Sequence, residues 1–163
     1  MHTPTEIADS FSSIDAHDDT IEAINVIPAA GRASCKVAIT LYRHREHKRR
    51  LLQFTGCANI NLKADATVLL GNAPNNTCGL EATASVDEIV KLMRSQKKDW
   101  NVTYQKSIDP LPAKLAAATS YVLFRVRVFG GILEVVAKSF KVTRLTLRSS
   151  GTAQKRAAPQ FER

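Results

Sequence analysis

The feature that most constrains the fold is a pair of alternating apolar segments around Gly130-Gly131, near the carboxyl end of the chain. Residues 121–129 and 132–137 both carry apolar side chains at every second position. A period of two is typical of a strand with one buried face, and a two-residue glycine turn favours a tight hairpin. The sequence therefore predicts an antiparallel hairpin here.

The register of this hairpin follows from the turn. A loop of Gly130 and Gly131 alone places Arg127 opposite Glu134, so that opposite charges meet on the outer face. The residues expected together on the inner face are Phe124, Val126, Val128, Leu133, Val135 and Ala137. Beyond Lys138 the alternation slips by one residue. This slip predicts either a bulge near Lys138-Ser139 or a strand covered on both faces.

Similar alternation predicts further strands over residues 37–42, 52–62 and 100–105. Gly56 interrupts the second of these and indicates a bulge. The residues expected on its inward face are Leu52, Phe54, Ala58, Ile60 and Leu62. Residues 18–27 resemble either a capped helix start or a strand, and their β-branched content and Pro28 favour a strand. Residues 65–70 stay open between helix and strand.

One helix is predicted clearly. Ser85-Val-Asp-Glu88 is a capping box, and apolar residues follow at helical spacing over residues 85–99. Residues 113–119 are rich in alanine, which favours about two further helical turns. The fold class that we expect is α+β, a single domain with a mainly antiparallel sheet, the 85–99 helix packed on it and a C-terminal Gly-Gly hairpin.

The chain of 163 residues is long enough for one self-sufficient core. We expect this domain to span residues 18–147, after an acidic segment at 1–17 that forms a loosely ordered arm or a short helix, and before a disordered basic tail at 148–163. No apolar run approaches the roughly 20 residues that cross a bilayer, and no secretory signal is recognised. The expectation is therefore a cytoplasmic protein with no transmembrane segment.

Charge is unevenly distributed. The net charge is +8, yet residues 1–22 contain six carboxylates and no lysine or arginine. A basic run follows on the connection between the 37–42 and 52–62 strands, and its members are Arg43, Arg45, Lys48, Arg49 and Arg50. Such a run attracts anionic partners. The alternative is that the acidic segment folds over the basic residues and neutralises them within the chain.

Catalytic motifs are not recognised. His44-Arg-Glu-His47 lacks the spacing of helix-borne zinc motifs, and His44-Arg-Glu46 lacks the second half of the deaminase signature. Cys57 or Cys78 could act as a nucleophile only with a histidine base that the sequence does not bring near either of them. The three cysteines are odd in number and include no CxxC pair, so they give no closed disulfide framework and are expected to be reduced structural thiols. We expect no enzyme, no cofactor and no metal site.

The function expected is a non-catalytic role in binding another protein, an acidic one by charge, through a sheet face or the basic loop. The residues predicted to contact the anionic partner are Tyr42, Arg43, Arg45, Lys48, Arg49, Arg50 and Arg125. The alternative is nucleic-acid binding by the 43–50 loop with Arg125 and Arg127 on a strand face, where Phe129 could stack a base. Because the five cations of the loop are expected to be exposed, replacing them all by serine is expected to leave stability nearly unchanged.

Overall fold

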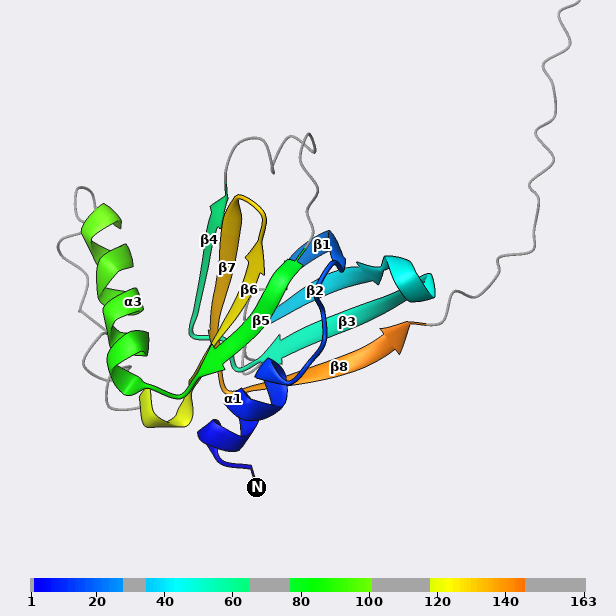
Figure 1. The fold of residues 1–163 in the computed structure, drawn as a ribbon. Coiled ribbons are helices and arrows are strands. Elements are labelled where there is room, and N and C mark those ends of the chain that lie inside the picture. The colour runs from blue at the N-terminus through cyan, green and yellow to red at the C-terminus, as the bar shows by residue number, and fades with distance from the viewer. Residues whose placement is uncertain (1, 28–34, 65–76, 101–117, 146–163) are drawn as a thin grey trace, which may run out of the picture.

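The computed structural model describes residues 2–27, 35–64, 77–100 and 118–145, which form two four-stranded antiparallel sheets and two α-helices (Figure 1). Sheet A has the order β1-β2-β3-β8, with β1 at Thr20–Ile27, β2 at Lys36–Arg43, β3 at Lys48–Thr55 and β8 at Ser139–Leu145. Sheet B has the order β4-β7-β6-β5, with β4 at Asn59–Ala64, β7 at Gly131–Ala137, β6 at Val122–Val128 and β5 at Thr77–Thr83.

The helices lie outside the two sheets. α3 (Val86–Trp100) covers the face of sheet B that points away from sheet A, and α1 (Pro4–Ser12) lies at the base of the molecule beside β5 (Figure 1). Two short 3₁₀ turns, η1 (His44–Glu46) and η2 (Ala118–Ser120), complete the described elements. The expected α+β class, with antiparallel sheets and the 85–99 helix packed on one of them, is confirmed.

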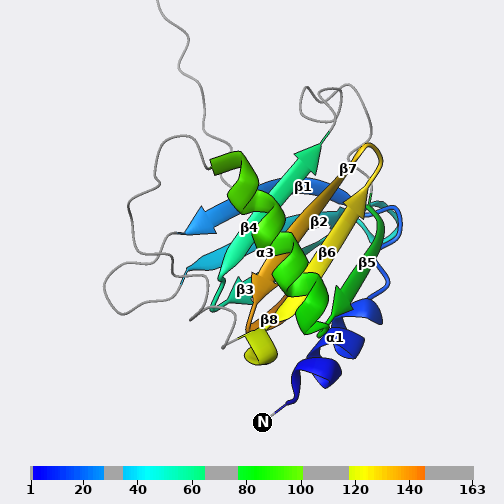
Figure 2. The same cartoon turned by 90° about the vertical axis from the view of Figure 1, so that its left-hand side faces the viewer.

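Two segments of the chain, β3–β4 and β7–β8, pass from one sheet to the other through a corner. Thr55 is opposite Ser139 in sheet A, and the same two chain segments continue into sheet B as β4 and β7. Across the corner the Lys138 N–H donates to the Thr55 carbonyl at 3.1 Å, and the Ala58 N–H donates to the Val136 carbonyl at 2.8 Å. Strands that change sheet in this way join two sheets whose strands cross, as Figure 2 shows.

The corner explains both predicted irregularities. Gly56 has a φ of +66°, a conformation that favours glycine, and a Cβ at this position would lie 3.1 Å from Cγ of Lys138. Lys138 is the one residue between β7 and β8, so the inward alternation restarts at Phe140. The slip near Lys138-Ser139 is therefore a real interruption of the strand.

The register predicted for the C-terminal hairpin is wrong by two residues. The turn is formed by Phe129 and Gly130, and only Gly130 has a positive φ, of +79°. Gly131 therefore opens β7, and Glu134 lies opposite Arg125 instead of Arg127. Because a shift of two keeps every side chain on its face, the predicted inner face is confirmed as buried.

A cluster of phenylalanine rings holds the two sheets and α1 together. Phe54 of β3 and Phe140 of β8 come from sheet A, and Phe124 of β6 comes from sheet B. Phe11 of α1 contacts all three, with ring centroids 5.9, 5.1 and 5.0 Å away respectively. Such tilted and edge-on aromatic contacts add to the gain from burying the rings. Phe11 therefore closes one end of the space between the sheets.

For residues 1–17 the sequence leaves open a loosely ordered arm or a short helix, and residues 4–12 form the helix α1. Thr3 and Glu6 make a complete capping box, in which the Thr3 N–H donates to the Glu6 carboxylate at 2.8 Å. Pro4 occupies the first turn, where it costs no hydrogen bond. Ala8 and Phe11 are buried. A helix this short carries too few apolar residues to show a clear period, and it is stabilised mainly by packing.

The predicted helix at 85–99 is observed one residue later, as α3. The Ser85 hydroxyl accepts a hydrogen bond from the Glu88 N–H at 3.4 Å, as the capping box predicts. Apolar side chains of α3 form a second small core with the outer face of sheet B: Ile89, Leu92, Met93, Leu123 and Val136.

The strand predictions at 52–62 and 100–105 differ from the structure in part. Ile60 and Leu62 fall on the inner side of β4, as expected, but are 36% and 49% exposed, because β4 is an edge strand. The strand predicted at 100–105 begins with Trp100, which instead ends α3. The remainder of that prediction, the segments 65–70 and 113–117, and the tail at 148–163 lie outside the described residues.

We predict that Phe11→Ala lowers the free energy of unfolding by about 3–5 kcal/mol, because it leaves a cavity at the centre of the ring cluster. Urea unfolding followed by circular dichroism measures this change. The matched control is Phe129→Ala, since Phe129 is 55% exposed in the hairpin turn. It should change stability by about 0.5 kcal/mol or less. Equal effects at the two positions would show that α1 does not close the core.

Candidate functional site

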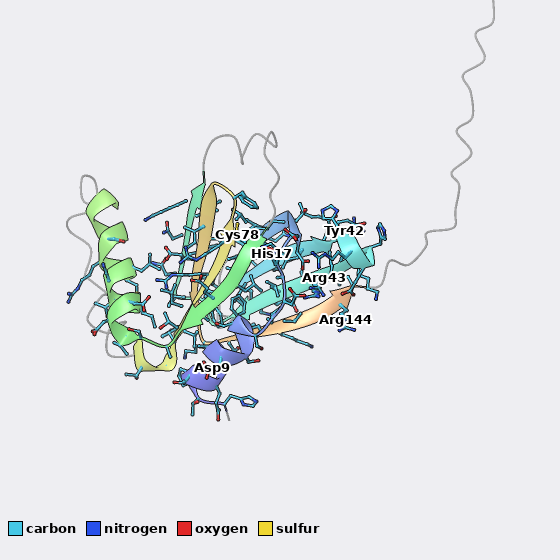
Figure 3. The ribbon with its side chains drawn as sticks, viewed as in Figure 1. Asp9, His17, Tyr42, Arg43, Cys78 and Arg144 are labelled. Atoms are coloured by element: carbon cyan, nitrogen blue, oxygen red, sulfur yellow. The ribbon has the colours of Figure 1, made fainter. Side chains whose placement is uncertain are left out.

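The basic run lies at one end of sheet A, where β2 turns into β3 through η1. Arg43 ends β2 and continues the inward alternation of the buried residues of that strand. Arg50 of β3 pairs with Leu41 and also points inward, whereas Tyr42 and Arg49 are paired on the outer face. Figure 3 shows Tyr42 and Arg43 at this end of the molecule, with Arg144 at the nearby end of β8.

Arg43 is the centre of an ionic cluster. Its guanidinium lies 2.7 Å from a Glu46 carboxylate oxygen, 2.5 Å from Asp15 and 3.3 Å from Asp19. The side chain of Arg43 is 14% exposed and that of Asp19 only 2%. Arg50, 11% exposed, donates to the Asp15 carbonyl at 2.7 Å. These charges therefore cover the end of the apolar core beside the connection between α1 and β1.

The outer-face members of the run are also paired. Arg49 donates two hydrogen bonds to the Glu22 carboxylate, at 2.6 and 2.8 Å, in the bidentate geometry that arginine favours. Its guanidinium carbon lies 5.4 Å from the ring centre of Tyr42, within range of a cation–π contact. The Tyr42 hydroxyl is 3.1 Å from Nδ1 of His47.

The two most exposed cations of the run pair more loosely. Arg45, 85% exposed, lies 3.5 Å from Asp18, and Lys48, 58% exposed, lies 3.4 Å from Glu46. The five cations of the run thus lie against five carboxylates, and the formal charges of the two groups cancel. The carboxylates are those of Asp15, Asp18, Asp19, Glu22 and Glu46. This is the intramolecular neutralisation that the sequence left open as an alternative. The basis for expecting a stability-neutral replacement of all five cations is also lost, because Arg43 and Arg50 are largely buried.

The other predicted contacts lie elsewhere. Arg125, on the face of sheet B under α3, lies 2.8 Å from Glu88 of α3 and 3.2 Å from Glu134 of β7. Arg127 lies 2.7 Å from Glu81 of β5. The structure thus does not bring Arg125 together with the 43–50 run, which belongs to sheet A.

The nucleophile candidates have no catalytic neighbours in the described part of the chain. Burial, and secondly the nearby Cys35, raise the pKa of the Cys57 thiol to about 11, which opposes formation of a thiolate. Cys78 is exposed on β5. Nε2 of His44 is 2.6 Å from the Thr20 hydroxyl. Among the described residues no three side chains of the metal-ligating types gather in one place.

A feature that sequence reasoning left unplaced is the face of sheet A that points away from sheet B. Its two central rows of directly paired residues each cross the four strands: Asn25, Ala38, Gln53 and Lys141 in one, and Ala23, Thr40, Leu51 and Thr143 in the other. We call these eight residues the outer face of sheet A. None of them is buried, and no described helix covers them.

Two exposed lysines add charge to this face, one within it and one at its border. Lys141 lies at the β8 end of the first row, and Lys36 begins β2 at the next paired position along the strand. Neither makes an ion pair with any described carboxylate, unlike the cations of the 43–50 run. The alternating pattern predicted which side chains point outward. It could not show that sheet B packs against the inner face of sheet A, or that α3 packs on the outer face of sheet B.

Comparison with protein families, with curated proteins and with solved structures finds no match to this chain. Within the described ranges, no helix has the length and apolar character needed to cross a membrane.

We predict that Arg43→Met lowers the free energy of unfolding by about 3 kcal/mol, because it leaves the buried Asp19 carboxylate without its cation. The matched control is Arg45→Met at the other end of the same turn, where the exposed side chain should change stability by about 0.5 kcal/mol or less. Chemical denaturation of the two variants measures the difference. Similar values for both would contradict the central position of Arg43.

The same cluster predicts a loss of stability in acid. Hydrogen bonds from Arg43 lower the pKa of both Asp15 and Glu46, and hydrogen bonds from Arg49 lower the pKa of Glu22. A carboxyl with a lowered folded pKa contributes stability above its unfolded pKa, about 4, and loses it as pH falls through the folded value. The stability difference between wild type and Arg43→Met should therefore narrow from pH 6 to pH 2.5. A constant difference, measured by urea unfolding at each pH, would contradict this.

Proposed function

We propose that this chain is a non-catalytic binding domain that contacts an acidic surface of another protein through the outer face of sheet A. The observation that carries the proposal is the uncovered state of this face among the described residues. The central strands of the two sheets bury their inner faces against each other, with Ile60 and Leu62 still exposed at the β4 edge, and α3 packs on the outer face of sheet B. A surface of four antiparallel strands that lacks a helical cover is a suitable platform for a partner.

The chemistry of the face suits a polar, specific contact. Gln53 at its centre is exposed and presents both a donor and an acceptor, while Thr40 and Thr143 add hydroxyl groups around Leu51. Lys36 and Lys141 add positive charge that no described carboxylate offsets. A rim of this sign favours an acidic partner, because complementary potentials speed association and exclude partners of like charge.

The basic run supports the binding role less well than the sheet face does. An anionic partner that took Arg43 would have to displace the carboxylates that already bind it, and would leave the buried Asp19 unpaired. Leaving a buried charge unpaired costs several kcal/mol. Arg50 already donates a hydrogen bond to the Asp15 carbonyl. Arg45 and Lys48 are exposed, but they lie at the β2–β3 turn, outside the eight residues of the face.

Nucleic-acid binding is the alternative, and the same pairing weakens it. Arg125 and Arg127 are both engaged with carboxylates of neighbouring elements, so a phosphate would have to compete with them. The net charge of +8 still favours polyanions as a class. The two functions are best separated by experiment.

Photo-crosslinking tests the proposed face directly. A benzophenone amino acid at Thr143 should crosslink a protein in extracts of the source cells, whereas the same residue at the exposed Lys91 of α3 should not crosslink it. The crosslinked protein is then purified and titrated by calorimetry. Gln53→Glu together with Lys141→Glu should weaken its binding at least tenfold, since both changes add negative charge to the contact.

The control for this titration is Arg45→Ser with Lys48→Ser, which should change the affinity less than threefold. An equal loss of affinity for the partner in both double variants would contradict the assignment to sheet A. Titration of a labelled single strand and duplex over 50–200 mM salt tests the alternative. Tight binding with a steep salt dependence, abolished by Arg45→Ser with Lys48→Ser, would replace the proposal by nucleic-acid binding.

A further inference from the structure

Cys35 and Cys57 lie opposite each other at the corner where the chain leaves sheet A. The Cys57 N–H donates a hydrogen bond to the Cys35 carbonyl at 3.1 Å. Cys35 directly precedes β2, and Cys57 lies between β3 and β4. The two residues are 22 positions apart in sequence, so this contact is created by the fold.

The bulge at Gly56 selects this pairing. Within the β2–β3 ladder Lys36 is opposite Thr55, and continuing that register would place Cys35 opposite Gly56. Gly56 instead takes a φ of +66°, which adds one residue to its strand and brings Cys57 to the Cys35 carbonyl. Directly opposed residues of an antiparallel pair have Cα atoms about 4.5–5.5 Å apart, within the range that a disulfide spans.

Both cysteines also line the same open pocket, of about 560 Å³, and the other lining residues with polar side chains are Thr55, Tyr121, Lys138 and Ser139. The Cys57 thiol donates to the Phe54 carbonyl at 3.5 Å and the Cys35 thiol to the Lys36 carbonyl at 4.0 Å, and a thiol is a weak hydrogen-bond donor. Cys78 is exposed on β5 and does not line this pocket.

We propose that Cys35 and Cys57 form a reversible disulfide by exchange with a small-molecule disulfide that enters this pocket. The bond would join the start of β2 to the β3–β4 corner. It is independent of the binding role proposed above, because it requires no partner protein.

The reaction has two exchange steps. The Cys35 thiolate attacks one sulfur of the small disulfide, forms a mixed disulfide and releases one thiolate, which takes up a proton. Cys57 then loses its proton to solvent and attacks the Cys35 sulfur, which releases the second thiol. Two protein thiols are oxidised and one small disulfide is reduced to two thiols. Because burial raises the pKa of Cys57 to about 11, the first attack falls to Cys35.

The test uses the reduced full chain and oxidised glutathione at pH 8, followed by thiol counting and non-reducing peptide mapping. The expected product has a bridge between Cys35 and Cys57 and one free thiol, that of Cys78. The bridge closes a loop of about 20 residues and should raise Tm by about 5–10 °C. Dithiothreitol should reverse both changes.

Variants separate the specific pair from general thiol reactivity. Cys78→Ser should lose both of its thiols on oxidation and show the same rise in Tm, whereas Cys57→Ser should form no bridge to Cys35. The wild-type chain oxidised in 8 M urea should give mixed pairings. The proposal fails if the native chain bridges Cys78 to either partner, if Cys35 and Cys57 stay reduced while Cys78 becomes glutathionylated, or if the bridged chain melts at a lower temperature.

Discussion

The ion pair between Arg43 and Asp19 is the interaction on which the surface properties of this protein depend. It fixes the connection between α1 and β1 against the hairpin end of sheet A, which lies at the opposite end of β3 from Phe54 of the phenylalanine cluster. A charge as buried as Asp19 requires a partner, and Arg43 supplies it while also binding Asp15 and Glu46. The acidic beginning of the chain is thus part of the fold, and the basic run is its counterpart.

This pairing changes how the net charge should be interpreted. A run of five cations in eight residues indicates an anion-binding surface when it is considered alone. In the structure these cations are matched by carboxylates, four of which lie between residues 15 and 22. Among the described residues, Lys36 and Lys141 are cations without a described carboxylate partner that lie on or beside the outer face of sheet A. The proposed binding role therefore moves from the hairpin end to the sheet face.

The sequence predicted the elements whose signals are local and repeated. The period-two pattern found β2, β3, β6 and β7 and their inner faces, and the Ser85 cap found α3. It could not separate Gly130-Gly131 from Phe129-Gly130 as the turn, because both registers keep the same side chains buried. It left α1 open between a loose arm and a short helix, because a capping box and two buried residues carry little signal, and it left β5 undefined. Neutralisation of the basic run was also left open, and the individual pairs could not be predicted because Asp19 and Arg43 meet only after β1 pairs with β2.

Modification of arginines by phenylglyoxal, mapped by mass spectrometry on the native chain, tests the central claim most directly. Arg144 is exposed on the strand next to Arg50 and makes no ion pair with the described carboxylates, so it serves as an internal reference. The account predicts that Arg144 reacts at least tenfold faster than Arg43 and Arg50, and that the difference disappears in urea. Reaction of Arg43 and Arg50 at the rate of Arg144 in the native chain would show that the basic run is free, and would return it to consideration as the binding surface.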